Sequence, residues 1–273
     1  MIIIAEKING SIPSMQKAIA AHDEAWIKDI AKKESDVLDM DRDFIDCCTS
    51  VEEHELETME WMIGLIQEVC DNKIAIDSPN PQICLDAMKF CKKPGMINSV
   101  SGEGNKIDLV FPVLAKPENK AWDVMALLCD DTGIPKSAAD RIRVLDNIMA
   151  KAKEYGIAES RIHIDPLIEM LCTSEEGIDL VLEVMDYIKE HYPQAHISGA
   201  VSNISFNLPY RKIINQAFTV VCIQHGMDSG VLDPLNRDLR GSIYAAEALT
   251  GEDFYCMEYI GAHREGIFGP VDK

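Results

Sequence analysis

Eight short apolar runs alternate with longer segments of helical spacing, and this alternation limits the possible folds of the 273-residue chain more than any other feature. Each run has the length of a buried strand, and each intervening segment is long enough for a crossover helix. Alternation of this kind predicts a parallel sheet covered by helices. The runs are Ile2–Ala5, Val37–Met40, Lys73–Ile76, Gly95–Ile97, Val124–Cys129, Arg161–Ile164, Ile197–Val201 and Phe218–Ile223.

Helical patterns between the runs are equally regular. In the pattern over residues 177–191 the apolar residues fall at i, i+3, i+4, i+7 and i+10, on one helical face. Asn80 followed by Pro81 is typical of a helix start, and Ser137 with Asp140 forms a capping pair. Similar patterns span residues 15–33, 55–70 and 138–155.

Eight strand–helix units predict a single (β/α)8 TIM barrel, an α/β fold. A doubly wound open sheet is the rival architecture, but eight regular units without a glycine-rich first turn favour closure. The chain contains no Gly/Ser linker, low-complexity stretch or charge block between two parts. We therefore expect one domain over residues 1–273.

Charge and cysteine content narrow the possible settings. The chain has 26 basic and 46 acidic residues, a net charge of −20, which disfavours binding to nucleic acid or to an anionic membrane surface. No apolar run approaches the roughly 18 residues of a membrane-spanning helix, and the start lacks the basic region of a signal peptide. Nine cysteines without a CxxC pair fit reduced thiols in the cytoplasm.

Polar residues end five successive apolar runs. These are Asp77, Asn98, Asp130 with Asp131, Asp165 and Asn203. The carboxyl ends of barrel strands form the usual active-site face, so we expect these side chains to gather there. Alternate strand residues share a face, so an inward Asp165 implies an inward His163, with Ile162 and Ile164 packed against helices.

A ring of carboxylates and carboxamides suits a flat ligand with several N–H donors and ring-nitrogen acceptors. A carboxylate accepts two parallel hydrogen bonds from an amino-pyrimidinone edge, and a carboxamide donates and accepts at once. The alternative is that each residue caps the helix that follows it. Capping is a poorer explanation for all five, because Asp77 is followed by a better cap at Asn80.

The motifs around these residues resemble those of the methyltetrahydrofolate–corrinoid protein methyltransferases. That family belongs to the pterin-binding barrels, together with dihydropteroate synthases and the folate module of cobalamin-dependent methionine synthase. The resemblance runs from Glu6-Lys7-Ile8-Asn9 to Asp233-Pro234-Leu235. Its motifs, in order, are Ile76-Asp77-Ser78-Pro79-Asn80-Pro81, Met96-Ile97-Asn98-Ser99, Asp130-Asp131-Thr132-Gly133-Ile134-Pro135, Ile164-Asp165-Pro166-Leu167 and Ser202-Asn203-Ile204-Ser205-Phe206.

The resemblance implies a role for each matching residue. It implies that Asp77, Asn98 and Asp165 bind the pterin ring, and that Asn203, the catalytic residue, lies near N5, the atom that carries the methyl group. Arg211 matches a family arginine near the folate. Residues expected either to touch the ligand or to brace a neighbour are Glu6, Asn9 and Asp130.

The same resemblance implies the substrates and partners. Tetrahydrofolate or methyltetrahydrofolate is the folate substrate, and a separate corrinoid protein supplies the cobalamin. It also implies a homodimer and no bound metal. The sequence leaves open the direction of methyl transfer, the identity of the corrinoid partner, the upstream methyl donor and the docking surface.

Two departures from the family pattern are visible. The first strand is followed by Glu6-Lys7-Ile8-Asn9, where the family often has Glu-Arg-Ile-Asn. The second strand, expected at Val37–Met40, usually ends in an Asp-x-Asn-x-Gly pattern in the family, whereas here the corresponding residues are Asp39-Met40-Asp41-Arg42-Asp43. The roles of Asp41 and Asp43 therefore stay open, as do those of the cysteines.

An asparagine near N5 fits methyl transfer in either direction. N5 leaves poorly unless it gains a proton or a strong hydrogen bond, and as the attacking atom it needs a free lone pair. The Asn203 amide offers both a donor and an acceptor. We expect it to stabilise the transition state, with the N5 proton exchanged through water or a nearby acid.

Three other functions are compatible with parts of this pattern. Dihydropteroate synthase needs basic groups for a leaving diphosphate, and no Lys or Arg adjoins Asn203. A metal-dependent barrel hydrolase would recruit several histidines, but no HxH or HExxH spacing occurs and His163 stands alone on its run. A non-catalytic folate-binding barrel would need no group at N5.

Overall fold

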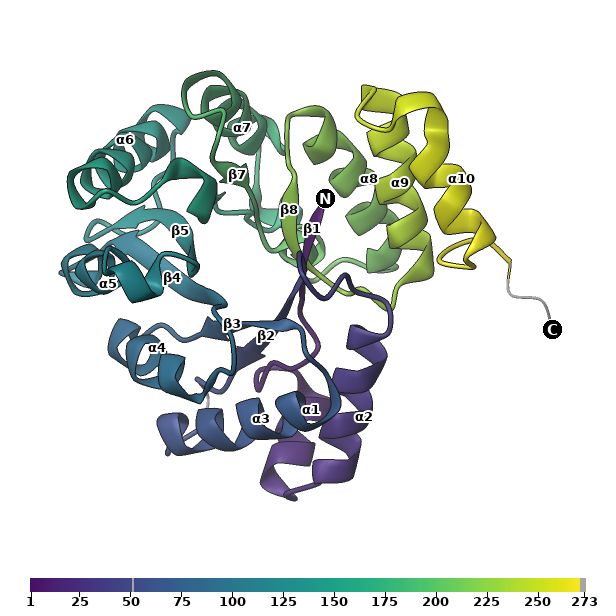
Figure 1. The fold of residues 1–273 in the computed structure, drawn as a ribbon. Coiled ribbons are helices and arrows are strands. Elements are labelled where there is room, and N and C mark those ends of the chain that lie inside the picture. Colours follow the sequence, from purple (N-terminus) through teal and green to yellow (C-terminus); the bar gives the residue numbers. More distant parts are fainter. Residues whose placement is uncertain (51, 271–273) are drawn as a thin grey trace.

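Eight parallel strands form the centre of the molecule, and helices surround them (Figure 1). The computed structural model describes residues 1–50 and 52–270. Neighbouring strands follow the order β7-β6-β5-β4-β3-β2-β1-β8. The strands are β1 (Ile2–Ala5), β2 (Phe44–Cys48), β3 (Lys73–Asp77), β4 (Met96–Gly102), β5 (Asp123–Asp130), β6 (Ile162–Asp165), β7 (His196–Ile197) and β8 (Ser229–Leu232).

The sheet closes between its last two strands. Asp228 N donates to Ile197 O at 3.2 Å, and Val231 N donates to Gly199 O at 3.0 Å. Ala200 and Val231 form a parallel bridge just beyond β7. The predicted α/β TIM barrel is therefore confirmed, with its seam held by few backbone bonds.

Helices cover the outside of the strands, and several begin as the sequence predicts. The Asn80 side chain accepts from Gln82 N at the start of α4, and Ser137 Oγ accepts from Asp140 N at the start of α6. The pattern over residues 15–33 forms two helices, not one, because Asp23 caps a new start. The helices are α1 (Pro13–Ala20), α2 (Glu24–Ser35), α3 (Glu55–Val69), α4 (Pro81–Ala87), α5 (Lys106–Leu114), α6 (Ala138–Tyr155), α7 (Asp179–His191), α8 (Arg211–Gln224), α9 (Arg237–Thr250) and α10 (Met257–Arg264).

Two predicted strands are wrong. Val37–Met40 lies in the turn before β2, where Asp43 N donates to Asp39 O at 2.9 Å. The true strand at Phe44–Cys48 carries Asp46 at its centre, so its sequence does not form an apolar run. Phe218–Ile223 belongs to α8, where its buried residues recur at helical spacing, and the eighth strand lies further along the chain. The predicted strand over residues 197–201 is also too long, since β7 ends at Ile197.

Asp41 and Asp43 lie at the amino end of β2, away from the carboxyl-end face. Asp43 is buried and accepts from Ile3 N at 3.0 Å and Asp39 N at 3.0 Å. Arg42 Nε also donates to Asp43 Oδ1 at 3.0 Å. Asp43 therefore ties the base of β2 to β1, and neither acid belongs to the strand-end ring.

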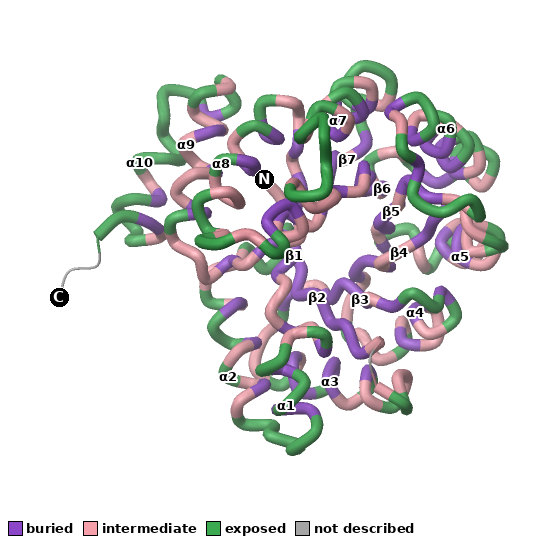
Figure 2. The backbone as a smooth tube through the Cα atoms, turned by 180° about the vertical axis from the view of Figure 1, so that it is seen from behind, coloured by how far each residue is buried: buried purple, intermediate pink, exposed green. Residues whose placement is uncertain are grey.

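The core has two parts, and the strands between them are mostly buried (Figure 2). A large apolar cluster fills the space between strands and helices. A small cluster fills the inside of the barrel: Ile4, Phe44, Ala75, Met96 and Met125. His163 adds to this inner layer, with Nδ1 2.8 Å from Ser229 Oγ, while Ile162 and Ile164 face the helices as predicted.

No helix in the described ranges, 1–50 and 52–270, is long and apolar enough to cross a membrane.

Candidate active site

A polar layer lies directly above the apolar layer inside the barrel. Strand residues two apart share a face, so the residue two positions after each inner apolar residue also points inward. In four strands that residue is polar: Ile4 leads to Glu6, Phe44 to Asp46, Ala75 to Asp77 and Met96 to Asn98. In β6 the same step leads from His163 to Asp165. These five side chains form the candidate site at the carboxyl ends of the strands.

The β2–β4 side of the site holds two carboxyl groups and one carboxamide. Asn98 Nδ2 donates to Asp46 Oδ1 at 3.3 Å, and Asp77 pairs in register with Asn98 and with Cys48. Asp46 is 1% exposed. Burial raises the pKa of Asp46 well above its ordinary value, and raises that of Asp77 to about 6. Two carboxyl groups this close hold a proton readily, so the pair offers a ligand both an acceptor and a donor.

Asp165 forms the opposite side of the site. Its carboxylate is 8% exposed, and Oδ1 accepts from Leu167 N at 2.7 Å. Burial raises the pKa of Asp165 to about 6, against the lowering effects of Leu167 N, Arg141 and the Ala200 backbone. The following loop therefore holds the Asp165 carboxylate in place at the inner face of the barrel.

A fully buried arginine fixes the loop that holds Asp165. Arg141, on α6, donates from Nε to Pro135 O at 3.2 Å and from Nη1 to Leu167 O at 2.6 Å. Nη1 also donates to Pro166 O, and Nη2 pairs with Glu169. The guanidinium thus joins the loop after β5 to the loop after β6. Sequence analysis missed Arg141, because a charged residue in a helix gives no signal of burial.

Asn203 lies in a turn and not on a strand. The segment Val201–Ser205 is a short 3-10 turn after β7, and Arg211 braces it from α8. Arg211 Nε donates to Ser205 Oγ at 2.9 Å, and Nη2 donates to Ser202 O at 2.6 Å. Among the described residues, the Asn203 side chain has no hydrogen-bond partner, so its amide is available to a ligand. Arg211 supports the turn through these bonds.

Glu6 connects this turn to β1. Ser202 Oγ donates to Glu6 Oε2 at 3.1 Å, and burial raises the pKa of Glu6 above its ordinary value. Behind it, Lys7 Nζ pairs with Asp233 Oδ2 at 2.7 Å and Lys7 N donates to Glu34 Oε1 at 3.0 Å. Glu34 is fully buried and burial raises its pKa to about 8, so it is neutral near pH 7.

Two predicted residues lie outside this group. Asp130 has the parity of Val124, Ala126 and Leu128, which face the helices, and it pairs with Arg143 Nη2 at 3.0 Å. Its hydrogen bonds to Thr132 and Arg143 lower its pKa. Asn9 Oδ1 accepts from Ser11 N at 2.9 Å and so closes its own turn. Both residues shape loops at the mouth, and neither faces the five inward side chains.

Asp46 is the inward residue that sequence analysis missed. It lies in β2 at Phe44–Cys48, whereas the second strand was expected at Val37–Met40. Asp46 was therefore not among the predicted strand-end residues. The residues around Asp46 do not resemble a metal centre. Within the described ranges, no three His, Cys, Asp or Glu side chains gather in a way that would hold a metal ion.

The site can therefore bind a flat, neutral ligand rich in N–H groups. Its carboxyl groups are buried, and burial raises the pKa of Asp77 and of Asp165 to about 6, so protonation of these groups is less costly than in water. A barrel with such a mouth fits the pterin-binding class, and comparison with known proteins confirms it. The pterin binding enzyme family matches residues 17–233, and the chain belongs to that family.

A curated relative matches along nearly the whole chain. The methylcorrinoid:tetrahydrofolate methyltransferase of Eubacterium limosum is 42% identical over 274 residues, which covers 99% of each protein. At this identity and coverage the two chains share their fold.

Solved structures confirm the fold at much lower identity. A dihydropteroate synthase of Coxiella burnetii, solved with pteroic acid, has a TM-score of 0.63 and 15% identity and covers 91% of this chain and 93% of its own. The dihydropteroate synthase of Yersinia pestis has a TM-score of 0.61 and 12% identity, covering 91% and 92%. These likenesses show the pterin-binding barrel and nothing about the reaction.

Proposed function

We propose that the protein transfers a methyl group between a methylcorrinoid and the N5 atom of tetrahydrofolate. The observation that carries the proposal is the 42% identity, over 99% of both chains, to the Eubacterium limosum methyltransferase of that name. The inward polar layer supports it independently, because its carboxyl and amide groups suit the N–H edge of a pterin.

The favoured direction is from the methylcorrinoid to tetrahydrofolate, as in the relative's name. In that direction the N5 lone pair attacks the methyl carbon, and the Co–C bond pair stays on cobalt. N5 then carries an extra proton, which must leave. Asp46, Asp77 and Asp165 hold the pterin ring through its N–H groups, with Asn98 as a donor and acceptor between strands.

Asn203 acts at N5 in this proposal. Before transfer its amide oxygen accepts a hydrogen bond from N5–H, which keeps the N5 lone pair directed at the methyl group. In the reverse step its amide N–H donates a hydrogen bond to N5. Glu6 is a nearby acid of raised pKa, joined to the same turn through Ser202, and takes the N5 proton through water. Arg211 contributes by fixing the turn.

The corrinoid is a substrate delivered to the barrel mouth by a separate protein. Cobalt must approach N5 directly, so the partner covers the carboxyl-end face around Asn203. We further propose a cytoplasmic homodimer built from one-domain chains of residues 1–273. Exposed apolar side chains between α9 and α10 support self-association: Leu249 is 82% exposed, Phe254 78% and Met257 63%.

An anoxic absorbance assay tests the reaction. The purified protein is mixed with tetrahydrofolate and methylcobalamin, and conversion of methylcobalamin to cob(I)alamin is followed. We expect conversion that depends on the protein and on tetrahydrofolate. The mixture of methyltetrahydrofolate and cob(I)alamin, run in parallel, compares the two directions. No conversion in either mixture, or with a methylated corrinoid protein as donor, contradicts methyl transfer even if tetrahydrofolate binds.

Dihydropteroate synthesis is the alternative reaction for this fold. The solved synthases share the fold, but their 12–15% identity does not extend to the reaction. Incubation with a pterin pyrophosphate and 4-aminobenzoate should give no dihydropteroate. Formation of that product would replace the proposal.

A further inference from the structure

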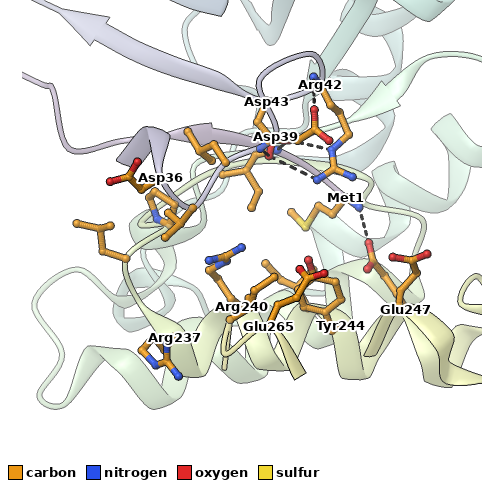
Figure 3. Close-up of a pocket in the computed structure, with 18 of the residues that line it drawn as sticks. Met1, Asp36, Asp39, Arg42, Asp43, Arg237, Arg240, Tyr244, Glu247 and Glu265 are labelled. Carbon is orange, nitrogen blue, oxygen red and sulfur yellow. Dashed lines mark hydrogen bonds and ion pairs between the residues drawn. The ribbon is translucent and has the colours of Figure 1, made fainter. Parts of the chain in front are cut away.

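A cavity of about 890 Å³ lies beside the barrel and away from the polar layer (Figure 3). Its walls come from the turn before β2 (residues 36–43), the start of β1, α9 and the segment around α10. The volume is within the range of small-molecule sites. Asp43, at the amino end of β2, lies on one wall, so the cavity is distinct from the carboxyl-end site.

Arg240, on α9, points into this cavity (Figure 3). Its side chain is 6% exposed, and its buried Nε has no hydrogen-bond partner. The guanidinium forms no ion pair with any residue in the described ranges. The Tyr244 phenol interacts with it from the next turn of α9, and the Asp43 carboxylate attracts it without direct contact. An unpaired buried cation is costly, and a cavity in front of it indicates a missing anionic partner.

The other cationic groups of the cavity already have partners. Arg42 Nε pairs with Asp43 Oδ1 at 3.0 Å, and Arg237 Nη2 donates to Gly269 O at 3.2 Å. The amino group of Met1 pairs with Glu247. Arg240 is therefore the position at which an incoming anion would gain most.

The cavity as a whole is acidic, which limits the ligand further. Eight carboxyl groups line it, against three arginines and the Met1 amino group. Such a wall repels polyanions such as nucleotides. Three of these carboxyl groups, those of Glu252, Glu258 and Glu265, form no ion pair within the described ranges 1–50 and 52–270. Each is available to a cation.

We propose that this cavity binds a small zwitterion with one carboxylate and at least one ammonium group. The carboxylate pairs with Arg240 and accepts from the Tyr244 hydroxyl, and the ammonium group faces Glu252, Glu258 and Glu265. Charge-assisted bonds at both ends discriminate against a molecule that has only one of the two groups. Binding at this cavity is independent of methyl transfer at the barrel mouth.

Calorimetric titration with L-lysine at low ionic strength tests the proposal. L-lysinamide lacks the carboxylate, and hexanoate has the same carbon chain without ammonium groups. We expect saturable one-to-one binding of L-lysine and at least about tenfold weaker binding of both analogues, because each loses one set of charge-assisted bonds. The absence of saturable heat with all of L-lysine, L-ornithine and L-alanine overturns the proposal. Equal binding of L-lysine, L-lysinamide and hexanoate also overturns it.

Substitution of Arg240 locates the binding. Arg240→Met keeps the length of the side chain and removes its charge, so L-lysine binding should fall at least about tenfold. The melting temperature should rise, because the unpaired buried charge is gone. If Arg240 had only a structural role, its loss would lower the melting temperature instead. Wild-type affinity in this variant overturns the assignment. If Arg240→Met does not fold, Arg240→Lys and Tyr244→Phe take its place. Both should lose less L-lysine affinity than is expected for Arg240→Met, with the larger loss in Arg240→Lys.

Asp165→Ala serves as the control for position. It alters the proposed pterin site and should leave L-lysine binding unchanged, so loss of folate binding and loss of zwitterion binding are separate results. Loss of L-lysine binding in Asp165→Ala would place the ligand at the barrel mouth and contradict the lateral site.

Discussion

The two sides of the barrel mouth are held by different kinds of interaction. On one side Asp46, Asp77 and Asn98 project from strands that pair residue by residue, so the backbone sets their positions. On the other side β7 has two residues, and Asn203 stands in a turn that Arg211 and Glu6 hold by side-chain bonds. Ladder pairing suits residues that hold a ring in one place. A turn fixed by side chains suits a residue whose amide must change its role during the reaction.

The largest effect is expected on the turn side. In the reverse step, from methyltetrahydrofolate to cob(I)alamin, where the Asn203 amide donates to N5, Asn203→Ala should lower turnover by about 10²–10³, the cost of one donor directed at developing charge. Tetrahydrofolate affinity should change little. Single-turnover rates and equilibrium titration measure the two quantities. Asn203→Asp is the matched variant, since it keeps the shape but cannot donate when ionised. Equal losses of rate and affinity would make Asn203 a binding residue and remove the contrast between the two sides.

Asp165 projects from a strand, β6, although it lies opposite Asp46, Asp77 and Asn98, and Asp165→Ala should act on binding. We expect roughly 10- to 100-fold weaker tetrahydrofolate binding, since a charge-assisted hydrogen bond is lost. Turnover at saturating folate should fall much less. Fluorescence titration of both Asp165→Ala and Asp165→Asn gives the comparison, because Asn keeps one acceptor. Unchanged affinity in Asp165→Ala would exclude contact between this carboxylate and the ring.

The brace behind Asp165 should affect stability first. Arg141→Lys leaves some of the carbonyls of Pro135, Pro166 and Leu167 without a donor, so unfolding should become easier by about 1–3 kcal/mol. Urea denaturation measures this loss. Tetrahydrofolate affinity should fall in parallel, because the Leu167 N–H no longer holds Asp165. A variant with wild-type stability would show that the loops keep their shape without the guanidinium.

Glu34 gives a pH-dependent test. Its native pKa of about 8 exceeds its ordinary value of 4.5, so the native state keeps a proton that the unfolded state loses between these values. Glu34 therefore contributes most stability below pH 4.5, and this contribution is lost as pH rises toward 8. Glu34→Gln should match wild type at pH 5 and be more stable at pH 8.5. Parallel stability curves for the two proteins, from urea midpoints across this range, would contradict a neutral Glu34.

Asp130 provides the smallest expected effect and a control for the whole site. It is a carboxylate at a strand end like Asp165, but it faces α6 through Arg143. Asp130→Ala should change tetrahydrofolate affinity less than about twofold, since it lies outside the inward layer, and stability by under about 0.5 kcal/mol. A loss comparable to that of Asp165→Ala would place Asp130 in the ring after all.

Several parts of the site were predictable because they depend on local sequence. The alternation along β6 predicted an inward His163, and its bond to Ser229 together with the outward packing of Ile162 and Ile164 confirms this. Asn80 and Ser137 cap their helices because their side chains reach the first free backbone N–H groups. The motif order also predicted the pterin-binding family.

Other parts required the tertiary structure. Asp46 interrupts the apolar run of β2, and only pairing with β3 identifies that segment as a strand. Asp130 ends a strand as Asp77 does, but its parity relative to Met125 turns it outward. Arg141 and Arg240 lie in helices among other charged residues, and packing alone buries them.

The sequence by itself determined the alternation of strands and helices, six of the eight strands and most of the inward polar layer, whereas closure depends on the backbone bonds between β7 and β8. Apolar spacing and capping are local properties, so they can be read along the chain. The tertiary structure decided which charged residues are buried, which strand-end acids face inward and where the lateral cavity lies. Burial and facing depend on contacts between segments distant in sequence, and a short segment contains no record of those contacts.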